Sequence, residues 1–496
     1  MRPFPPAAAS RGPDRDLPPN LRRPNRTIAN ASLDGAASEA RDHDLPPNLR
    51  RPNRTIANAS LKARGATLPA SLQGSATQFA YYSLLLFMVV YWARPEDWVP
   101  GLSGLPVAKV AGVLAVLAFA LTLGSLPGRS GLPAEIICLG LLGLELVVAG
   151  ALSPVWRSGA ILAALDFSKG ILIIVVIAFT VRTLAALRRL VFVQVGCVTM
   201  IAAATLASRH FNQLGRLVGV GNGMYANSND LALALSLALP FCLFFLLRSR
   251  NPLKKAVWCA AIVAMVCDVV LTASRAGTIA TLVGGGLCLW HFGVKGKRPV
   301  LVGAAGVLAL AIAMIAGARL KERFAATFSS EPGSKAALAA SGSASEREEL
   351  IIRSLVVTAQ HPLFGVGVNN FQVVSGNWHE PHDVWTQMSS EGGIPALILL
   401  LLIFGRSLST QRRLKSMASG TETEVDMWTG TLQAALVAFL AASFFFPVAY
   451  HYFPYLLVTY SCVLYRIVQQ QEEGSLQVDK SPRVARSLWY KSIHAS

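Results

Sequence analysis

Long apolar segments recur along most of this chain, and the polar stretches between them are short. Twelve segments predict membrane-spanning helices, over residues 79–93, 105–124, 132–152, 162–181, 189–207, 229–247, 256–272, 276–293, 299–317, 392–408, 428–446 and 450–468. The runs are continuous, whereas the strands of a membrane barrel alternate polar and apolar residues. Because each span must satisfy its own backbone polar groups in hydrocarbon, we expect an all-α polytopic membrane protein with about 12 transmembrane helices.

The composition supports a membrane protein, and the location of the cations explains the high net charge of the chain. The chain has 496 residues, of which 53% are hydrophobic and 15% charged, against about 25% charged in soluble domains. A net charge of +18 is compatible with nucleic-acid binding, but the cations lie mainly in short loops and in the two tails. All seven cysteines fall in apolar segments, which excludes a disulfide framework or a cysteine-based zinc site in the longest polar loop.

The two ends of the chain lack apolar periodicity. Residues 1–75 are rich in Pro, Arg and Asn, and the sequence DLPPNLRRPNRTIANASL at 16–33 recurs unchanged at 44–61. We interpret this region as a disordered basic tail with a recent duplication, since two copies are too few for a solenoid. No signal peptide is expected, because the first apolar segment begins near Phe79. A membrane domain over 76–470 and a cytoplasmic tail over 471–496 complete the predicted organisation.

Loops rich in lysine and arginine alternate with loops that hold few cations, and this pattern predicts the orientation of the spans. The cationic loops hold Arg129; Arg182, Arg188 and Arg189; Arg248, Arg250, Lys254 and Lys255; Lys295, Lys297 and Arg298; and Arg406, Arg412, Arg413 and Lys415. Cytoplasmic loops carry an excess of Lys and Arg. With an even number of spans, both termini are therefore predicted to be cytoplasmic.

This orientation places the longest polar loop, residues 318–391, outside the membrane between the ninth and tenth spans. It holds six Lys or Arg against eight acids, so it is not a polybasic surface. We expect residues 335–345 to be flexible, and Ser343 and Glu346 to form a capping box for an amphipathic helix over 346–360. His361-Pro362 should end that helix, and Pro381 should begin a short helix leading into the tenth span.

Two arginines are candidate anion ligands on the outer side. Arg275 lies at the outer tip of a tight hairpin between the seventh and eighth spans, and Arg216 lies in the preceding outer loop. The guanidinium fork suits a phosphate. The alternatives are an arginine that snorkels to the interface for Arg275 and a solvated side chain for Arg216.

The loop that carries Arg216 continues into a segment rich in glycine and asparagine, which ends at Asn227 and Asn229. Such a segment before a helix can present backbone N–H groups to an anion. The alternative is that Asn227 or Ser228 only caps the sixth span.

His382 is the candidate general base, because histidine titrates near neutral pH. Asn370, Trp378 and Asp383 are its polar or aromatic neighbours in sequence, and a solvated histidine is the alternative. His379 and His382 with nearby acids allow a metal site, but no His-Glu-x-x-His pattern is present. The Asp-x-Asp pairs occur only in the amino-terminal tail, which argues against a metal-diphosphate site outside.

Acidic residues inside predicted spans indicate a rival function. The four positions are Glu145, Asp166, Asp230 and Asp268. Intramembrane acids are functional candidates, and a proton relay through them would indicate a transporter or flippase. Their scatter, and the lack of symmetry between the two halves of the chain, make this the second hypothesis. A scaffold of an envelope complex is a third, and it would tolerate loss of His382 and Arg275 together.

Four segments in order resemble the O-antigen ligase superfamily, which includes O-antigen polymerases and protein O-oligosaccharyltransferases. Residues 219–233 (GVGNGMYANSNDLAL) are similar to its Gly-x-x-x-Asn-Pro-Asn-x-x-Ala segment, with Ser228 where proline is common. Residues 272–277 resemble its Ser-Arg-Gly/Ala-Gly hairpin, and 361–371 (HPLFGVGVNNF) its His-Pro-Leu-x-Gly-x-Gly turn. Residues 381–395 resemble its His-Asn stretch, with Asp383 where asparagine is common.

The resemblance implies an enzyme that transfers a glycan from an undecaprenyl-diphosphate carrier to an acceptor hydroxyl, at the outer face of a bacterial inner membrane. It implies that Arg275 and Arg216 bind the diphosphate, with Asn227, Asn229, Asn370 and Asp383 also contacting substrate. It implies that His382 accepts the proton, with no metal or other cofactor. The acceptor stays open between lipid A–core, a second glycan repeat unit and a protein Ser or Thr.

Overall fold

The computed structural model describes residues 75–99, 101–123, 131–213, 215–220, 223–328, 335–376, 379–417 and 423–480. Regular structure in these segments is helical, apart from one β-bridge between Phe211 and Leu217. The all-α prediction is therefore confirmed for the described part of the chain. The amino-terminal tail with its duplication, residues 481–496 and Trp378 lie outside the described residues.

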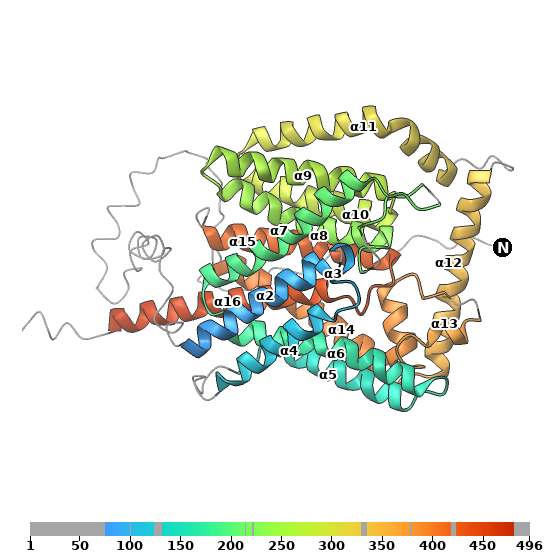
Figure 1. Ribbon diagram of the computed structural model, residues 1–496, viewed down its shortest axis with the longest axis horizontal. Coiled ribbons are helices and arrows are strands. Elements are labelled where there is room, and N and C mark those ends of the chain that lie inside the picture. The colour runs from blue at the N-terminus through green and yellow to red at the C-terminus, as the bar shows by residue number, and fades with distance from the viewer. Residues whose placement is uncertain are drawn as a thin grey trace, which may run out of the picture. The chain divides into compact units, whose positions relative to one another are not determined.

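The helices follow one another with short connections (Figure 1). They are α2 (Ser75–Ala93), α3 (Pro95–Trp98), α4 (Val107–Ala120), α5 (Ala134–Ala151), α6 (Arg157–Thr180), α7 (Leu184–Ser208), α8 (Ser228–Arg248), α9 (Pro252–Thr272), α10 (Arg275–Cys288), the π-helix η4 (Leu289–Lys295), α11 (Pro299–Phe328), α12 (Lys335–Gln360), α13 (Phe371–Val374), α14 (Val384–Met417), α15 (Glu424–Ala442), the 3-10 helix η5 (Ser443–Phe445) and α16 (Tyr452–Lys480). Each of the twelve predicted segments coincides with helical structure.

Nine helices of the described chain are long and apolar enough to cross a membrane. The apolar helices Val107–Ala120 and Pro299–Met314 are shorter, and α16 is not one of the nine. A span needs roughly 20 apolar residues to cross the hydrocarbon core. The chain is thus a polytopic membrane protein with nine candidate spans, and the count of twelve stays a prediction.

Helix α8 is the centre of the bundle, with 78% of its most apolar stretch buried, and it packs against α9, α10 and α15. Small residues allow these close contacts. A Cβ added to Gly277 of α10 would lie 2.5 Å from the Cβ of Ala232 in α8, and one added to Gly284 would lie 3.1 Å from Ala438 in α15. Helices in membranes associate through such small-residue contacts, because lipid supplies little hydrophobic drive between them.

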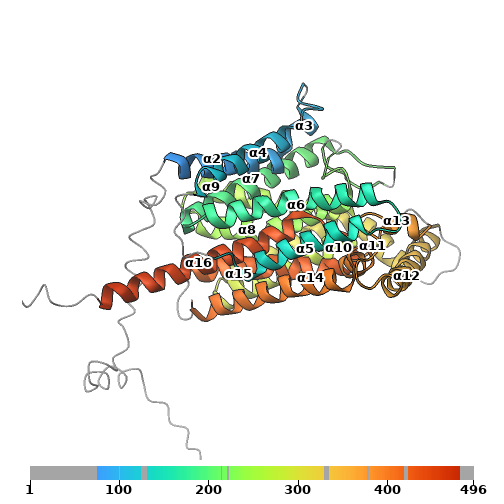
Figure 2. The same cartoon turned by 90° about the horizontal axis from the view of Figure 1, so that it is seen from below.

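The long loop is more helical than expected. Helix α12 begins at Lys335, so residues 335–345 are not the flexible segment that we predicted, and Ser343 and Glu346 fall inside the helix rather than at its start. The small residues of this stretch include several alanines, which have high helix propensity. Helix α12 runs across the general direction of the bundle (Figures 1 and 2). Its buried Leu350 and Val357 form a small core with Val366 and Phe371.

Helix α14 is broken at Gly393, whose φ of 81° and ψ of 179° are not helical. The break separates a short helix from the long apolar part, as predicted, but the short helix begins at Val384 rather than at Pro381. The reason is that Asp383 caps it. Its Oδ1 accepts the N–H groups of Trp385 (3.0 Å) and Thr386 (2.8 Å), and its Oδ2 accepts the Thr386 hydroxyl.

Candidate active site

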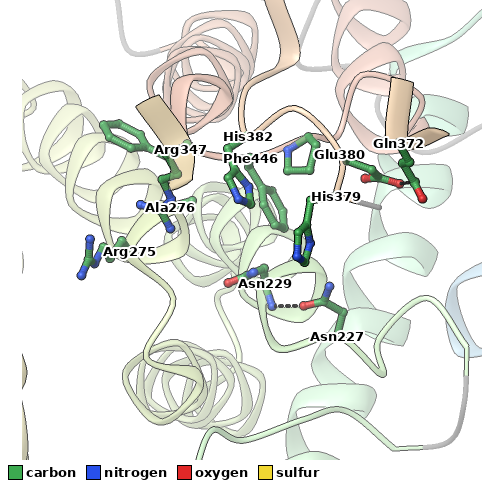
Figure 3. A pocket seen from close by; sticks show the side chains of 12 residues that line it. Asn227, Asn229, Arg275, Ala276, Arg347, Gln372, His379, Glu380, His382 and Phe446 are labelled. Atoms are coloured by element: carbon green, nitrogen blue, oxygen red, sulfur yellow. Dashed lines mark hydrogen bonds between the residues drawn. The ribbon is translucent and has the colours of Figure 1, made fainter. Parts of the chain in front are cut away.

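A cavity of about 400 Å³ lies where several connecting segments meet one end of the helix bundle. Its lining comes from the start of α8, the start of α10, α12, α13, the segment before α14 and the segment after α15 (Figure 3). The lining residues are Asn227, Asn229, Arg275, Ala276, Arg347, Gln372, His379, Glu380, His382, Phe445, Phe446 and Pro447. Four of the seven predicted site residues are therefore in one cavity, although they are far apart in sequence.

Arg275 is presented by a hairpin of only two residues between α9 and α10. Ala273 ends α9 with a positive φ of 50°, and the buried Ser274 caps α10 by accepting the N–H of Gly277 at 3.3 Å. Gly277 also brings this turn against α8, through its close approach to Ala232. The start of α10 is therefore fixed beside the start of α8, and Arg275 extends from it as an exposed side chain at the cavity.

Asn227 caps α8, as the simpler interpretation of the asparagines predicted. Its Oδ1 accepts the N–H of Asn229 at 2.9 Å, and both side chains also line the cavity (Figure 3). Arg216 does not line the cavity but lies directly behind this segment. It donates from Nε to the Thr272 carbonyl (2.8 Å) and from Nη2 to Asn229 Oδ1 (2.5 Å). Arg216 thus connects the asparagine segment to the hairpin of Arg275.

His382 lies two residues before α14, and its neighbour Asp383 fixes the start of that helix. Asp383 is 6% exposed and does not line the cavity, and its predicted contact with substrate stays a prediction. Aspartate and asparagine are about equally good helix caps. The departure from the family pattern at Asp383 therefore preserves the turn that presents His382.

Asn370 is a structural residue rather than a lining one. It is 1% exposed, and its Nδ2 is 2.8 Å from Ser153 Oγ, 3.0 Å from the Val366 carbonyl and 3.2 Å from the Trp156 carbonyl. It joins the turn before α13 to the connection between α5 and α6. Asn370 thus holds the long loop on the bundle, and its predicted contact with substrate stays a prediction.

We expect Asn370→Ala to lower stability while leaving a reduced but measurable activity. The change removes a buried amide that donates to Ser153 Oγ and to the Val366 carbonyl, a loss of about 1–3 kcal/mol. Thermal unfolding of the detergent-purified protein would show a lower midpoint. An unchanged midpoint together with a raised substrate KM would contradict the structural role and restore the predicted one.

The cavity also contains residues that are not among the seven predicted site residues. Gln372 and Glu380 face each other, with Gln372 Nε2 donating to Glu380 Oε1 at 2.8 Å. Burial raises the pKa of the Glu380 carboxyl, and this hydrogen bond acts in the opposite direction. Arg347 comes from α12, and Phe446 from the connection after α15. Only their placement on predicted outer segments could have suggested them.

The intramembrane acids occupy different surroundings. Asp166 is exposed and pairs with Lys169 one turn away on α6, whereas Asp268 is fully buried in α9. Asp230 Oδ1 lies 3.6 Å from His451 Nε2, near the cavity. Among the residues that the structure describes, no three His, Cys, Asp or Glu side chains form a group that could hold a metal ion.

These features define a class: a multi-pass membrane protein whose polar cavity, with arginines, histidines and asparagines, opens at one end of the helix bundle. A family model described as O-antigen ligase matches residues 260–401, from within α9 to within α14. The chain therefore carries an O-antigen ligase domain, and proteins of this family transfer lipid-linked glycans. The matched residues include Arg275, Arg347 and His382 but not Asn227 or Asn229. A search of curated proteins finds no match.

Proposed function

We propose that this protein is an O-antigen ligase that transfers a glycan from a polyprenyl-diphosphate carrier to an acceptor hydroxyl at the outer face of the inner membrane. The observation that supports this most is the meeting of Arg275, at the hairpin of α9 and α10, with His382, before α14, in one cavity. An anion ligand and a group able to accept a proton are the two elements that such a transfer requires.

Charge at the two ends of the bundle supports the outer location of the cavity. Arg188 of α7 and Arg248 of α8 both pair with Glu424 of α15, at 3.0 and 2.8 Å. These residues lie at the start of α7, the end of α8 and the start of α15, whereas the cavity lies at the start of α8. The cation-rich loops predicted to be cytoplasmic are thus at the opposite end from the cavity.

In the proposed reaction the acceptor hydroxyl oxygen attacks the anomeric carbon of the donor glycan. His382 takes the hydroxyl proton, the new C–O bond forms, and the bond between the anomeric carbon and the phosphate oxygen breaks. The electron pair leaves with the diphosphate, whose added negative charge is stabilised by Arg275. Arg347 is a second cation on the cavity wall. Arg216 has a positioning role in this proposal, because it holds Asn229 and the hairpin carbonyl.

Reconstitution tests the proposal directly. The full chain in lipid nanodiscs, given an undecaprenyl-diphosphate-linked oligosaccharide and a lipid A–core glycolipid, is expected to yield a longer glycolipid and free undecaprenyl diphosphate. The yield should be unchanged by a chelator, because arginines rather than a metal offset the charge. A requirement for a divalent cation would contradict this mechanism. Elongation of the lipid-linked glycan itself would instead identify a polymerase, and transfer to a serine peptide a protein ligase.

A further inference from the structure

The cavity has two ends of opposite charge. Figure 3 shows Arg275 and Arg347 at one end and Glu380 with Gln372 at the other, while His382 and Phe446 lie between them. The Glu380 carboxylate makes that end of the cavity unfavourable for a diphosphate, so a different ligand is expected there.

Glu380 and Gln372 form an ordered pair of planar polar groups. The amide of Gln372 donates to one carboxylate oxygen of Glu380 at 2.8 Å, which orients both side chains. Gln372 is itself held in place because its neighbour Phe371 is fully buried in the small core under α12. The second carboxylate oxygen and the amide oxygen are acceptors for hydroxyl groups. A partly buried carboxylate gains most from a ligand that supplies such donors, as a sugar does.

The middle of the cavity also fits a sugar ring. Phe446 lies beside His382, so an apolar ring surface adjoins the proton acceptor (Figure 3). Ligand sites commonly combine aromatic walls with a few placed polar groups that fix orientation. A pyranose has an apolar C–H face and hydroxyl groups at its edge, and it matches both features.

The direction of the proposed reaction decides which sugar this is. In an in-line displacement the attacking oxygen approaches the anomeric carbon from the side opposite the leaving group. With the diphosphate at Arg275 and Arg347, the attacking sugar lies on the far side of His382, which is the Glu380 end. We propose that Glu380 and Gln372 form the acceptor subsite and bind hydroxyl groups of the acceptor sugar. This inference rests on the proposed transferase function.

The subsite is tested with variants that keep the shape of the cavity. Glu380→Gln removes the charge at nearly constant volume, and Gln372→Leu removes the amide. The matched control is Glu348→Gln, which changes an exposed acid of α12 outside the cavity. The full chain in nanodiscs of phosphatidylethanolamine and phosphatidylglycerol receives an undecaprenyl-diphosphate-linked oligosaccharide as donor. Three acceptor probes are compared: a second lipid-linked oligosaccharide, a lipid A–core glycolipid and a serine-rich peptide.

Both subsite variants are expected to raise the KM for the sugar acceptor about tenfold or more, since a lost hydrogen bond to a charged group has about this effect. The donor KM should change less than about twofold, and the control should change neither value. Equal changes in donor and acceptor KM, or a fall in kcat alone, would overturn the acceptor assignment. If Gln372→Leu lowers the thermal midpoint strongly, the isosteric Glu380→Gln decides the matter.

Failure of the subsite and failure of the proposed function give different results. Transfer by the wild type to the peptide alone overturns the sugar subsite and leaves the transferase proposal standing. No transfer to any acceptor overturns the proposed function, and the subsite with it. Transfer to either sugar acceptor supports the subsite only when the Glu380→Gln and Gln372→Leu variants show the acceptor-specific change.

Discussion

Replacing His382 with alanine is expected to reduce glycan transfer by about 10²–10⁴-fold, the usual contribution of a general base. The imidazole lies between the cationic and acidic ends of the cavity, where the acceptor hydroxyl must lose its proton (Figure 3). The fold should survive, because the bonds from Asp383 to the backbone of α14 do not involve His382. Initial rates in nanodiscs, with the donor KM measured alongside, would show a fall in kcat with little change in donor binding.

His379→Ala is the matched control for this experiment. His379 is on the same segment and lines the same cavity, so it reports any general effect of removing an imidazole there. We expect it to retain activity within about tenfold of the wild type, well above the level of the His382 variant. If the two variants were equally inactive, or if His379→Ala were the worse, His382 would not be the general base. Full activity of both variants would contradict a catalytic role for His382 and would support the hypothesis that the protein is a scaffold.

Replacing Arg275 with alanine is expected to reduce kcat by about 10²–10³-fold, as the loss of one preorganised group facing a developing negative charge does. Arg275→Lys should recover only part of the rate, since an ammonium lacks the planar fork that contacts two phosphate oxygens. Inhibition by undecaprenyl diphosphate provides an independent measurement. The alanine variant should bind this product more weakly, because the leaving group and the product share the same diphosphate.

Arg250→Ala is the control for Arg275. Arg250 is an exposed arginine in the connection between α8 and α9, at the end of α8 opposite the cavity. Its loss changes the net charge of the protein by the same amount as Arg275→Ala, but it should leave kcat and product inhibition near the wild-type values. An Arg275→Ala enzyme with normal inhibition by undecaprenyl diphosphate would show that the arginine acts as an interfacial anchor. That result would support the alternative that Arg275 snorkels to the membrane interface.

Much of the fold followed from apolar run length, and the errors arose where length is a poor guide. The segment at 105–124 gives only the short helix α4, which begins directly after Pro106 and ends at Ala120. The start of α12 was missed because a stretch of small residues resembles a flexible linker in composition. The start of α14 was shifted because Pro381 was assigned to the first turn, whereas Asp383 provides the cap.

The site could be predicted only where a residue stands in a local pattern. His382, Arg275, Asn227 and Asn229 belong to short motifs, and the structure brings these four to one cavity. Asn370 and Asp383 belong to motifs too, but neither lines the cavity: the Asn370 amide group donates to Ser153, and Asp383 caps α14. No pattern in sequence distinguishes a polar group that binds substrate from one that holds a turn. Glu380 and Gln372 were missed because their pairing depends on how the loop closes.

The break at Gly393 brings the segment that carries His382 against the turn that follows α12. An added Cβ at Gly393 would lie 2.4 Å from the Leu363 carbonyl, and one at Gly365 would lie 2.4 Å from the backbone of Glu391. The turn after α12 and the end of the short helix therefore meet main chain to main chain. The position of His382 relative to the long apolar part of α14 thus depends on main-chain packing. A substitution of a surface side chain near the cavity can change which ligand it accepts and leave this packing intact.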